Sequence, residues 1–414
     1  MNVVASIIVN SFCPERAWPS YPYKLNLKNP LLVKITILLC SMMTVMAGAT
    51  IAPSLPAMTA AFPDNPAAET LVKLVLTIPG LFIAMSSPVS GWIIDRFGRI
   101  KLLIVSLLLY AAAGTSGLYL NTLVEIIIGR VFLGLAVGGI MTVAVTLIGD
   151  YFDGAERQKF LGIQASIMSL SGTIFISAGG ALADVGWRYP FGIYGMAILA
   201  VPLVLIYLKE PPKAEISLTA NKPAEKIPKL TWTIYILSFL GMTVFYMVPV
   251  QIPFLIKQIS NVGNAEAGYA LATSMLIAAL AAVNYPRIKR VLTHYQIYGI
   301  SFLLMGLGYA MIYWANSYAA VYPGLIVSGA GAGLIMPNSN LCLVTMAPVA
   351  LRGRILGLLS SFIFIGQFAS PLLLQPLVNA SSIRDGFLYL GLTMAFIAII
   401  SLIRNRRLVP VKAA

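Results

Sequence analysis

The chain has 414 residues, of which 59% are hydrophobic and only 10% are charged. Soluble proteins carry about 25% charged residues, so the composition excludes an ordinary soluble domain. The 28 Lys and Arg outnumber the 14 Asp and Glu, but they fall in short loops between apolar runs, so the basic charge does not indicate nucleic-acid binding.

Cysteine and histidine usage argues against several other classes. Cys13, Cys40 and Cys342 are far apart, two of them inside apolar runs, and the single histidine, His294, lies in a basic loop. These positions predict neither a disulfide framework nor a metal site. Because no nucleophile–base pair or metal cluster is evident either, we expect no enzyme and no cofactor.

The first 30 residues precede the first long apolar run. The apolar stretch 3–9 is too short for a signal peptide and lacks a basic region before it. Four prolines disfavour a helix here: Pro14, Pro19, Pro22 and Pro30. We expect residues 1–30 to form a cytoplasmic tail without a cleavable signal.

Apolar runs of membrane-spanning length recur along the whole remaining chain. A transmembrane helix needs about 20 such residues, and only helices or closed barrels can span a bilayer. The sequence therefore predicts an all-α polytopic membrane protein with twelve helices, with cores at 31–54, 71–94, 102–120, 123–147, 159–182, 189–208, 230–256, 266–286, 296–315, 318–343, 355–378 and 386–404.

One polar interruption is much longer than the others. Residues 209–229 are rich in Lys, Glu and Pro, and we interpret them as a cytoplasmic linker between two six-helix bundles, 31–208 and 230–404. Residues 405–414 form a short C-terminal tail in this interpretation.

Alternate loops differ sharply in basic charge. With twelve spans, 23 of the 28 Lys and Arg lie on the side of the linker and both termini, four lie on the other side, and Arg130 lies inside a span. Because Lys and Arg concentrate in cytoplasmic loops, we expect both termini in the cytoplasm and residence in the cell (inner) membrane.

The two bundles repeat at an offset of about 195 residues, a pattern seen in transporters with duplicated halves. Matching positions include three glycines and a basic pair in a short loop. They are Gly129, Gly134 and Gly138 with Gly324, Gly329 and Gly333, and Arg157 and Lys159 with Arg352 and Arg354. Shared membrane composition explains the glycines but not the basic residues, so duplication of a six-helix unit is the better interpretation.

The turn between the second and third spans has charges of both signs between two apolar runs. It reads Gly91-Trp-Ile-Ile-Asp95-Arg96-Phe-Gly98-Arg99-Ile-Lys101. Gly91 permits a close approach of a neighbouring helix, and Gly98 permits the positive φ of a tight turn. An ordinary basic loop is the alternative. The pattern resembles the loop 2–3 signature of the major facilitator superfamily.

That resemblance implies two pseudo-symmetric six-helix bundles that rock about a central site. It also implies a gate formed by Gly91, Asp95, Arg96, Gly98, Arg99 and Asp150. In such transporters the aspartate here at 95 meets the start of span 11, near 354–357, and the arginine here at 99 pairs with the acid here at 150.

Arg130 lies about seven residues inside the fourth span. A guanidinium in hydrocarbon costs roughly 3 kcal/mol on insertion scales, so it must face a cavity or a partner. Its surroundings resemble the span-4 motif of the drug/proton antiporter branch, although Leu133 stands where that branch often has Gln. The resemblance implies a role in proton coupling. The alternative is an arginine that reaches the membrane surface beside Glu125.

Two features weaken the likeness to that branch. The span-5 signature of the antiporters is reduced to Gly179 and Gly180, and all 14 acidic residues lie in tails, loops or span ends. No carboxylate is therefore expected deep in the membrane, and Asp95, Glu125 and Asp184 are the remaining candidates for binding a proton.

Uncharged polar side chains within spans are the candidates for substrate binding. An amide in lipid lacks partners, so each is expected to point inward, with interhelical hydrogen bonding as the alternative for any single one. The candidates are Gln164, Tyr246, Gln251, Asn284, Asn338, Asn340 and Gln367.

Together these features predict a monomeric transporter that exports a small amphipathic molecule, coupled to protons, by alternating access. Uptake or facilitated diffusion of a metabolite is the second interpretation. A membrane receptor or scaffold that does not transport is a third, which the two-state gate motif disfavours.

The topology can be tested by labelling. A cysteine introduced at Asn65 should react with an impermeant thiol reagent added from outside the cell, because its loop lies on the side with few basic residues. A cysteine at Ala220 in the linker should not react. Labelling at Ala220 but not at Asn65 would reject the orientation.

Overall fold

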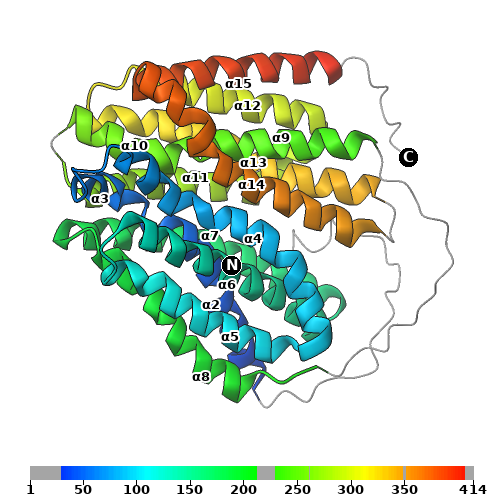
Figure 1. Ribbon diagram of the computed structural model, residues 1–414. Helices are drawn as coiled ribbons and strands as arrows, with labels where there is room; N and C mark the ends of the chain where they lie inside the picture. The colour runs from blue at the N-terminus through cyan, green and yellow to red at the C-terminus, as the bar shows by residue number, and fades with distance from the viewer. Residues whose placement is uncertain (1–28, 212–228, 261, 348–350, 406–414) are drawn as a thin grey trace.

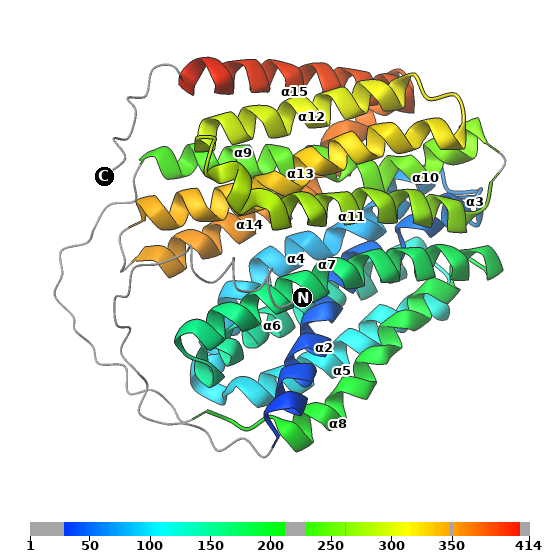
Figure 2. The ribbon, with the colours of Figure 1, turned by 180° about the vertical axis from the view of Figure 1, so that it is seen from behind.

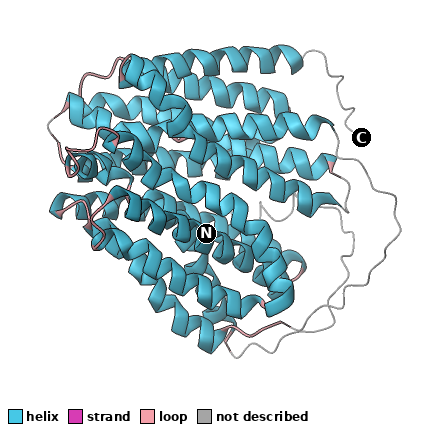
Figure 3. Cartoon of the chain, in the orientation of Figure 1, coloured by secondary structure: helices cyan, strands magenta, loops and turns pink. Residues whose placement is uncertain are grey.

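The computed structural model describes residues 29–211, 229–260, 262–347 and 351–405. Every regular element within them is a helix, as Figure 3 shows. Twelve helical stretches of this described part are long and apolar enough to cross a membrane, which confirms the predicted all-α class and the number of spans. The expectations for residues 1–28, 212–228 and 406–414 lie outside the described residues.

The first six spans form one bundle, called here the N-half (Figure 1). Its elements are α2 (Pro30–Ala49), η1 (Ala52–Ser54), α3 (Leu55–Ala60), α4 (Ala68–Phe97), α5 (Arg99–Gly114), η2 (Thr115–Leu118), α6 (Leu123–Tyr151), α7 (Gly154–Val185), η3 (Tyr189–Met196) and α8 (Ala197–Tyr207).

The other six spans form the C-half. Its elements are α9 (Lys229–Phe245), α10 (Met247–Ile259), α11 (Asn264–Lys289), α12 (His294–Tyr313), α13 (Tyr318–Met346), α14 (Arg352–Ala380) and α15 (Ile383–Asn405).

The first and seventh spans are broken at matching places, and proline explains both breaks. Helix α2 ends at Ala49 and α9 ends at Phe245, each four residues before a proline, Pro53 or Pro249. Proline has no N–H to donate to the carbonyl four residues earlier, so the helix ends or bends there. The break places Tyr246 between α9 and α10.

The halves meet along two helix pairs. Helix α4 lies beside α14, and α7 lies beside α11, as Figures 1 and 2 show from opposite sides. The end of the molecule where Gly98 lies near Glu210, just before the linker, is called here the linker end. The end where α4 and α11 begin is called the distal end.

Among the described glycines, those that lie against the other half are at the distal end and in the middle. A β-carbon added at Gly180 would lie 2.8 Å from the Asn264 carbonyl, and one at Gly80 would lie 2.9 Å from the Phe364 carbonyl. Toward the linker end, a β-carbon at Gly91, Gly162 or Gly357 would meet no atom within 4 Å. The two bundles therefore diverge toward the linker end.

The repeated glycines make equivalent contacts in the two halves. A β-carbon at Gly134 would lie 2.6 Å from the Pro79 carbonyl of α4, and one at Gly329 would lie 2.6 Å from the Ser274 carbonyl of α11. Both glycines let two helices pack backbone to backbone. The second and fourth spans thus pack as the eighth and tenth do, which is what the sequence repeat predicts.

The glycine contact within the N-half gives a stability prediction. Gly134→Ala should lower the melting temperature of the purified protein, because its new methyl group would overlap the Pro79 backbone and overpacking costs about 1–3 kcal/mol. Gly162→Ala is the matched control, since its methyl group enters open space. Equal melting temperatures for the two variants would contradict the packing described here.

Candidate functional site

The turn between α4 and α5 has the geometry expected from its glycine. Gly98 has φ of 94°, a conformation that L-residues with side chains rarely adopt. The carboxylate of Glu210 accepts hydrogen bonds from the backbone N–H of Arg99 at 2.7 Å and of Ile100 at 2.9 Å. Glu210 thereby caps the start of α5, where a negative charge also meets the helix dipole favourably.

Arg99 links this turn to the end of the fourth span. Its Nε lies 3.2 Å from Asp150 Oδ2, and its Nη1 lies 3.9 Å from Glu210 Oε1. The neighbouring Tyr151 bonds to both backbone groups of Lys209. The ion pair of Arg99 with Asp150, expected from the family resemblance, is present. The contacts of Arg99 with Glu210 and of Tyr151 with Lys209 hold the beginning of the linker on the N-half.

Asp95 makes no hydrogen bond or ion pair with the described residues of the C-half. Its side chain is exposed and makes no hydrogen bond or ion pair with another described residue. Arg96 rests 5.8 Å from the Trp92 ring and 5.7 Å from the Phe97 ring, on its own helix. Gly91 likewise has no close neighbour. Among the described residues, the expected contact of this turn with the start of span 11 is therefore not made, because the halves diverge toward the linker end.

Arg130 is fully buried, and helix breaks supply its acceptors. Its Nε donates to the Val75 carbonyl at 3.0 Å, and its Nη2 donates to the Ala47 carbonyl at 2.6 Å. The Val75 carbonyl lacks its usual partner because the residue four positions later is Pro79. Ala47 lies in the last turn of α2, where carbonyls also lose helical partners.

The charge of Arg130 has no acidic partner among the described residues. None of the ion pairs there includes it, and Glu125 bonds instead to the backbone of Thr122 in a capping box. The alternative of an arginine reaching Glu125 at the surface is therefore wrong. The Tyr194 ring lies 5.0 Å from the guanidinium carbon, and Nη1 is buried without a hydrogen-bond partner.

Two predicted substrate residues lie between the halves in the middle of the molecule. The hydroxyl of Tyr246 and the amide nitrogen of Gln367 lie 3.0 Å and 3.7 Å from where a β-carbon would stand at Gly48 of α2. Gln367 also packs on Gly80 of α4. Both residues therefore bring polar groups of the C-half to the face of the N-half.

Gln251 lies between the halves as well, but at the distal end. It is fully buried and its Oε1 accepts a hydrogen bond from Lys73 at 2.9 Å. Lys73, one of the four basic residues that the sequence analysis counts on the side with few charges, is fully buried too, and it reaches Gln375 of α14 at 2.7 Å. The available sequence signal was an acidic and a basic residue four positions apart, Glu69 and Lys73, at the start of an apolar run.

The remaining amides lie within single halves. Gln164 is buried and donates to Ser41 of α2 at 2.7 Å. Asn284 bonds to the Leu280 carbonyl of its own helix and to Arg287. Asn340 is half-buried. Local partners satisfy both ends of the Asn284 amide, and its role in substrate binding stays a prediction.

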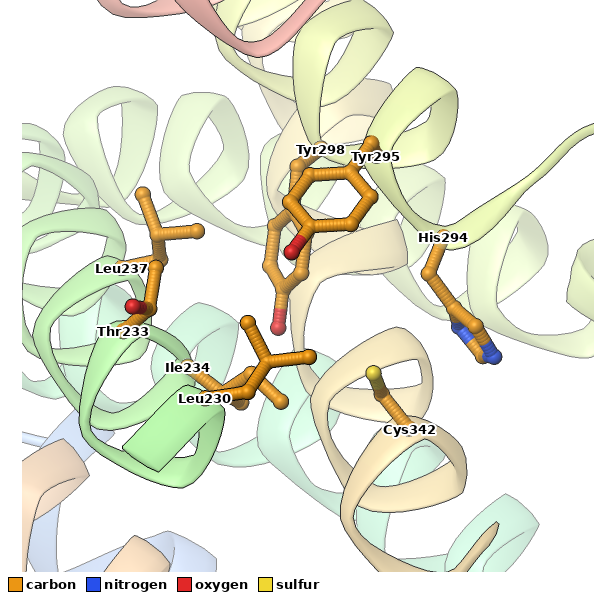
Figure 4. A pocket seen from close by; sticks show the side chains of 8 residues that line it. All are labelled: Leu230, Thr233, Ile234, Leu237, His294, Tyr295, Tyr298 and Cys342. Carbon is orange, nitrogen blue, oxygen red and sulfur yellow. The ribbon is translucent and has the colours of Figure 1, made fainter. Parts of the chain in front are cut away.

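The structure places Asn338 away from the space between the halves. It is fully buried inside the C-half, where its side chain bonds to Tyr285 at 3.1 Å and to both the ring and the carbonyl of His294. A cavity of about 10 Å³ lies nearby, and side chains from α9, α12 and α13 converge on it in Figure 4. One water needs about that volume, so this part of the C-half is packed core rather than a substrate site.

Comparison with known proteins decides the family. The model of the Major Facilitator Superfamily matches residues 37–295 and 234–413. The chain belongs to the major facilitator superfamily.

Curated relatives of this transporter include efflux proteins. It is 23% identical to the bacillibactin exporter of Bacillus subtilis, over 80% of this chain and 85% of that one. It is 20% identical to the quinolone resistance protein NorA of Staphylococcus aureus, over 78% of this chain and 84% of that one. These relatives support the predicted resemblance to the drug antiporter branch.

Solved structures agree on the fold of the transporter. A bacterial homologue of the human lysosomal transporter Spinster superposes with a TM-score of 0.77 at 15% identity, over 94% of this chain and 98% of that one. The D-xylose-proton symporter gives a TM-score of 0.71 at 16% identity, over 90% and 96%.

The reduced span-5 signature of the transporter has a packing role. Gly179 touches the Thr50 carbonyl at the end of the first span, and Gly180 packs against Asn264 and Gly268 of α11. Gly179 thus allows close packing within the N-half, and Gly180 allows close packing between the halves. The two glycines that this chain shares with the antiporter signature therefore lie where α7 crosses the end of α2 and the start of α11.

Arg130 gives the sharpest test of this site. Arg130→Ala should reduce transport at least about tenfold, since a hydrogen bond to a charged group is worth about 1.5–3 kcal/mol and the variant lacks the free Nη1 donor. Arg130→Lys should also be impaired, because one ammonium lacks the planar fork that reaches the Val75 and Ala47 carbonyls together. Transport is measured at matched amounts of folded protein, and parental activity in Arg130→Lys would remove Arg130 from the site.

Proposed function

We propose that the transporter exports small amphipathic molecules, neutral or anionic, in exchange for protons, by alternating access. The observation that carries this proposal is the one-sided contact of the halves, which touch at Gly80 and Gly180 but not at Gly91 or Gly357. Two rigid bundles joined at one end form one of the two states that such a cycle needs.

The orientation follows from the distribution of charge. We assign the linker end to the cytoplasm, because 23 of 28 Lys and Arg lie in the tails, linker and loops of that side. The described state would then be open toward the cytoplasm, from which an exporter collects its substrate. The proposed location is the cell (inner) membrane, with a single chain as the working unit.

The substrate class follows from the central charge. A lipophilic cation would meet the guanidinium of Arg130, which has no acidic partner among the described residues, and like charges in a low dielectric repel strongly. An acidic group could instead accept from the unpaired Nη1. Tyr246 and Gln367 would supply further hydrogen bonds from the C-half.

The direction and the gate rest on resemblance. The names of two relatives, an exporter and a drug-resistance protein, favour efflux, and the turn at Gly91–Lys101 matches the gate of the superfamily. In the opposite state, Asp95 would meet the start of α14, with Arg99 and Asp150 holding the turn in place.

Everted membrane vesicles test this function. When their interior is acidified, we expect accumulation of an amphipathic aromatic acid, loss of accumulation with a protonophore, and little accumulation of a lipophilic cation of similar size. Arg130→Ala vesicles are the inactive control. Uptake that ignores the pH gradient would favour facilitated diffusion, and no uptake of any of a broad compound panel would favour a receptor or scaffold.

A further inference from the structure

The distal end holds a buried lysine whose hydrogen bonds are complete. Lys73 is fully buried, and its Nζ donates to Oε1 of Glu69 at 2.5 Å, of Gln251 at 2.9 Å and of Gln375 at 2.7 Å. An ammonium group has three donors, so all are used. The Phe254 ring lies 4.6 Å from the nitrogen, which adds a favourable cation–π contact.

This cluster joins the two halves. Lys73 and Glu69 are on α4, while Gln251 is on α10 and Gln375 is on α14. Gln375 also donates to Glu69 at 3.1 Å and accepts from Gln251 at 3.0 Å. If the halves separated at the distal end, Lys73 would lose both glutamines and keep only Glu69, its neighbour one turn earlier on the same helix.

The closed distal end depends on the negative charge of Glu69. The side chains that face the pair from α10 and α14 are uncharged: Gln251, Phe254, Gln375 and Asn379. Helix α3 has no titratable residue. Arg130 of α6 also binds α4, at the Val75 carbonyl. Glu69 is therefore the single acidic partner of Lys73 among the described residues.

Burying a cation without its counter-charge is strongly unfavourable. Loss of the negative charge of Glu69 therefore favours a state in which the halves separate and water solvates Lys73. The carboxyl side chain of Glu69 is 45% exposed, so a proton from the distal side can reach it without the halves separating first.

We propose that Glu69 is a binding site for protons from the distal side and that the pair it forms with Lys73 is the latch of that end. Proton uptake by Glu69 removes the counter-charge of Lys73, and the distal end opens so that water solvates the ammonium. The proposal rests on the alternating-access cycle proposed above and adds the site through which distal pH acts on it.

Distance measurements between spin labels test the latch without any substrate. One label pair at Ala67 and Ser381, both exposed, reports opening of the distal end. A second pair at Gln158 and Val291, also exposed, reports the linker end. Each is introduced into a chain whose three native cysteines are replaced, and distances are measured from pH 8 to about pH 5.

Three variants separate charge from packing. In Glu69→Gln the ratio of open to closed distal ends should rise at least about tenfold at pH 8, because Lys73 remains charged. In Lys73→Met the opening caused by acid should disappear. The double variant Glu69→Gln with Lys73→Met should close again at every pH, since neither partner then carries charge. Asp64→Asn, at an exposed acid of the distal loop just before α4, should behave like the parent.

A double variant as open as Glu69→Gln, or Glu69→Gln as closed as the parent, would overturn the latch. Failure of the cycle itself would look different. If neither label pair changes its distance in any variant or at any pH, the halves do not alternate. If the linker-end pair moves while the distal pair ignores Glu69, alternating access stands and the latch alone is rejected.

Discussion

The need to satisfy backbone carbonyls inside a membrane shapes the N-half around Arg130. Pro79 leaves the Val75 carbonyl without a helical partner, and the end of α2 does the same near Ala47. Water is absent from the bilayer core, so such groups must find partners within the protein. One guanidinium bonds to both carbonyls from a third helix. The buried guanidinium of Arg130 thus joins α2, α4 and α6 by hydrogen bonds, and it is also the candidate for contact with the substrate.

The polar contacts of the two ends differ in kind. At the linker end, Arg99, Asp150 and Glu210 bond within the N-half. At the distal end, Asp184 caps the start of α11 across the interface, with Oδ1 2.6 Å from the Asn264 nitrogen. The described polar groups of the linker end thus bond to one another within the N-half, whereas those of the distal end bond across the interface between the halves. In an alternating-access cycle, the contact between the halves would move from one end to the other.

The sequence was sufficient for features that depend on local chemistry. Apolar run length predicted the twelve spans, and Gly98 predicted the positive φ of the turn. The pairing of Arg99 with Asp150 came from the family resemblance, not from the spacing of the residues. Each of these features is determined by a short stretch of chain or by a known motif.

Long-range burial could not be predicted in the same way. From the sequence, Lys73 was only one of the basic residues at the end with few charges, because its partners Gln251 and Gln375 are 178 and 302 positions away. Asn338 looked like a substrate ligand because a polar residue in a span faces inward whether it lies inside a bundle or between two bundles. Only the packing of α13 against α11 and α12 shows that it is inside one.

Helix α4 carries two attachments that lie two residues apart. The carbonyl of Val75 is bound by Arg130 of the N-half, and the side chain of Lys73 is bound by the C-half. Successive residues of a helix turn by about 100°, so the two attachments point to nearly opposite sides of one rigid rod. Any movement of α4 that breaks the Lys73 hydrogen bonds therefore also changes the geometry of the Arg130 hydrogen bond, and the reverse holds too. By thermodynamic reciprocity, a group that binds Arg130 more tightly in one state of the distal end must favour that state by the same free energy.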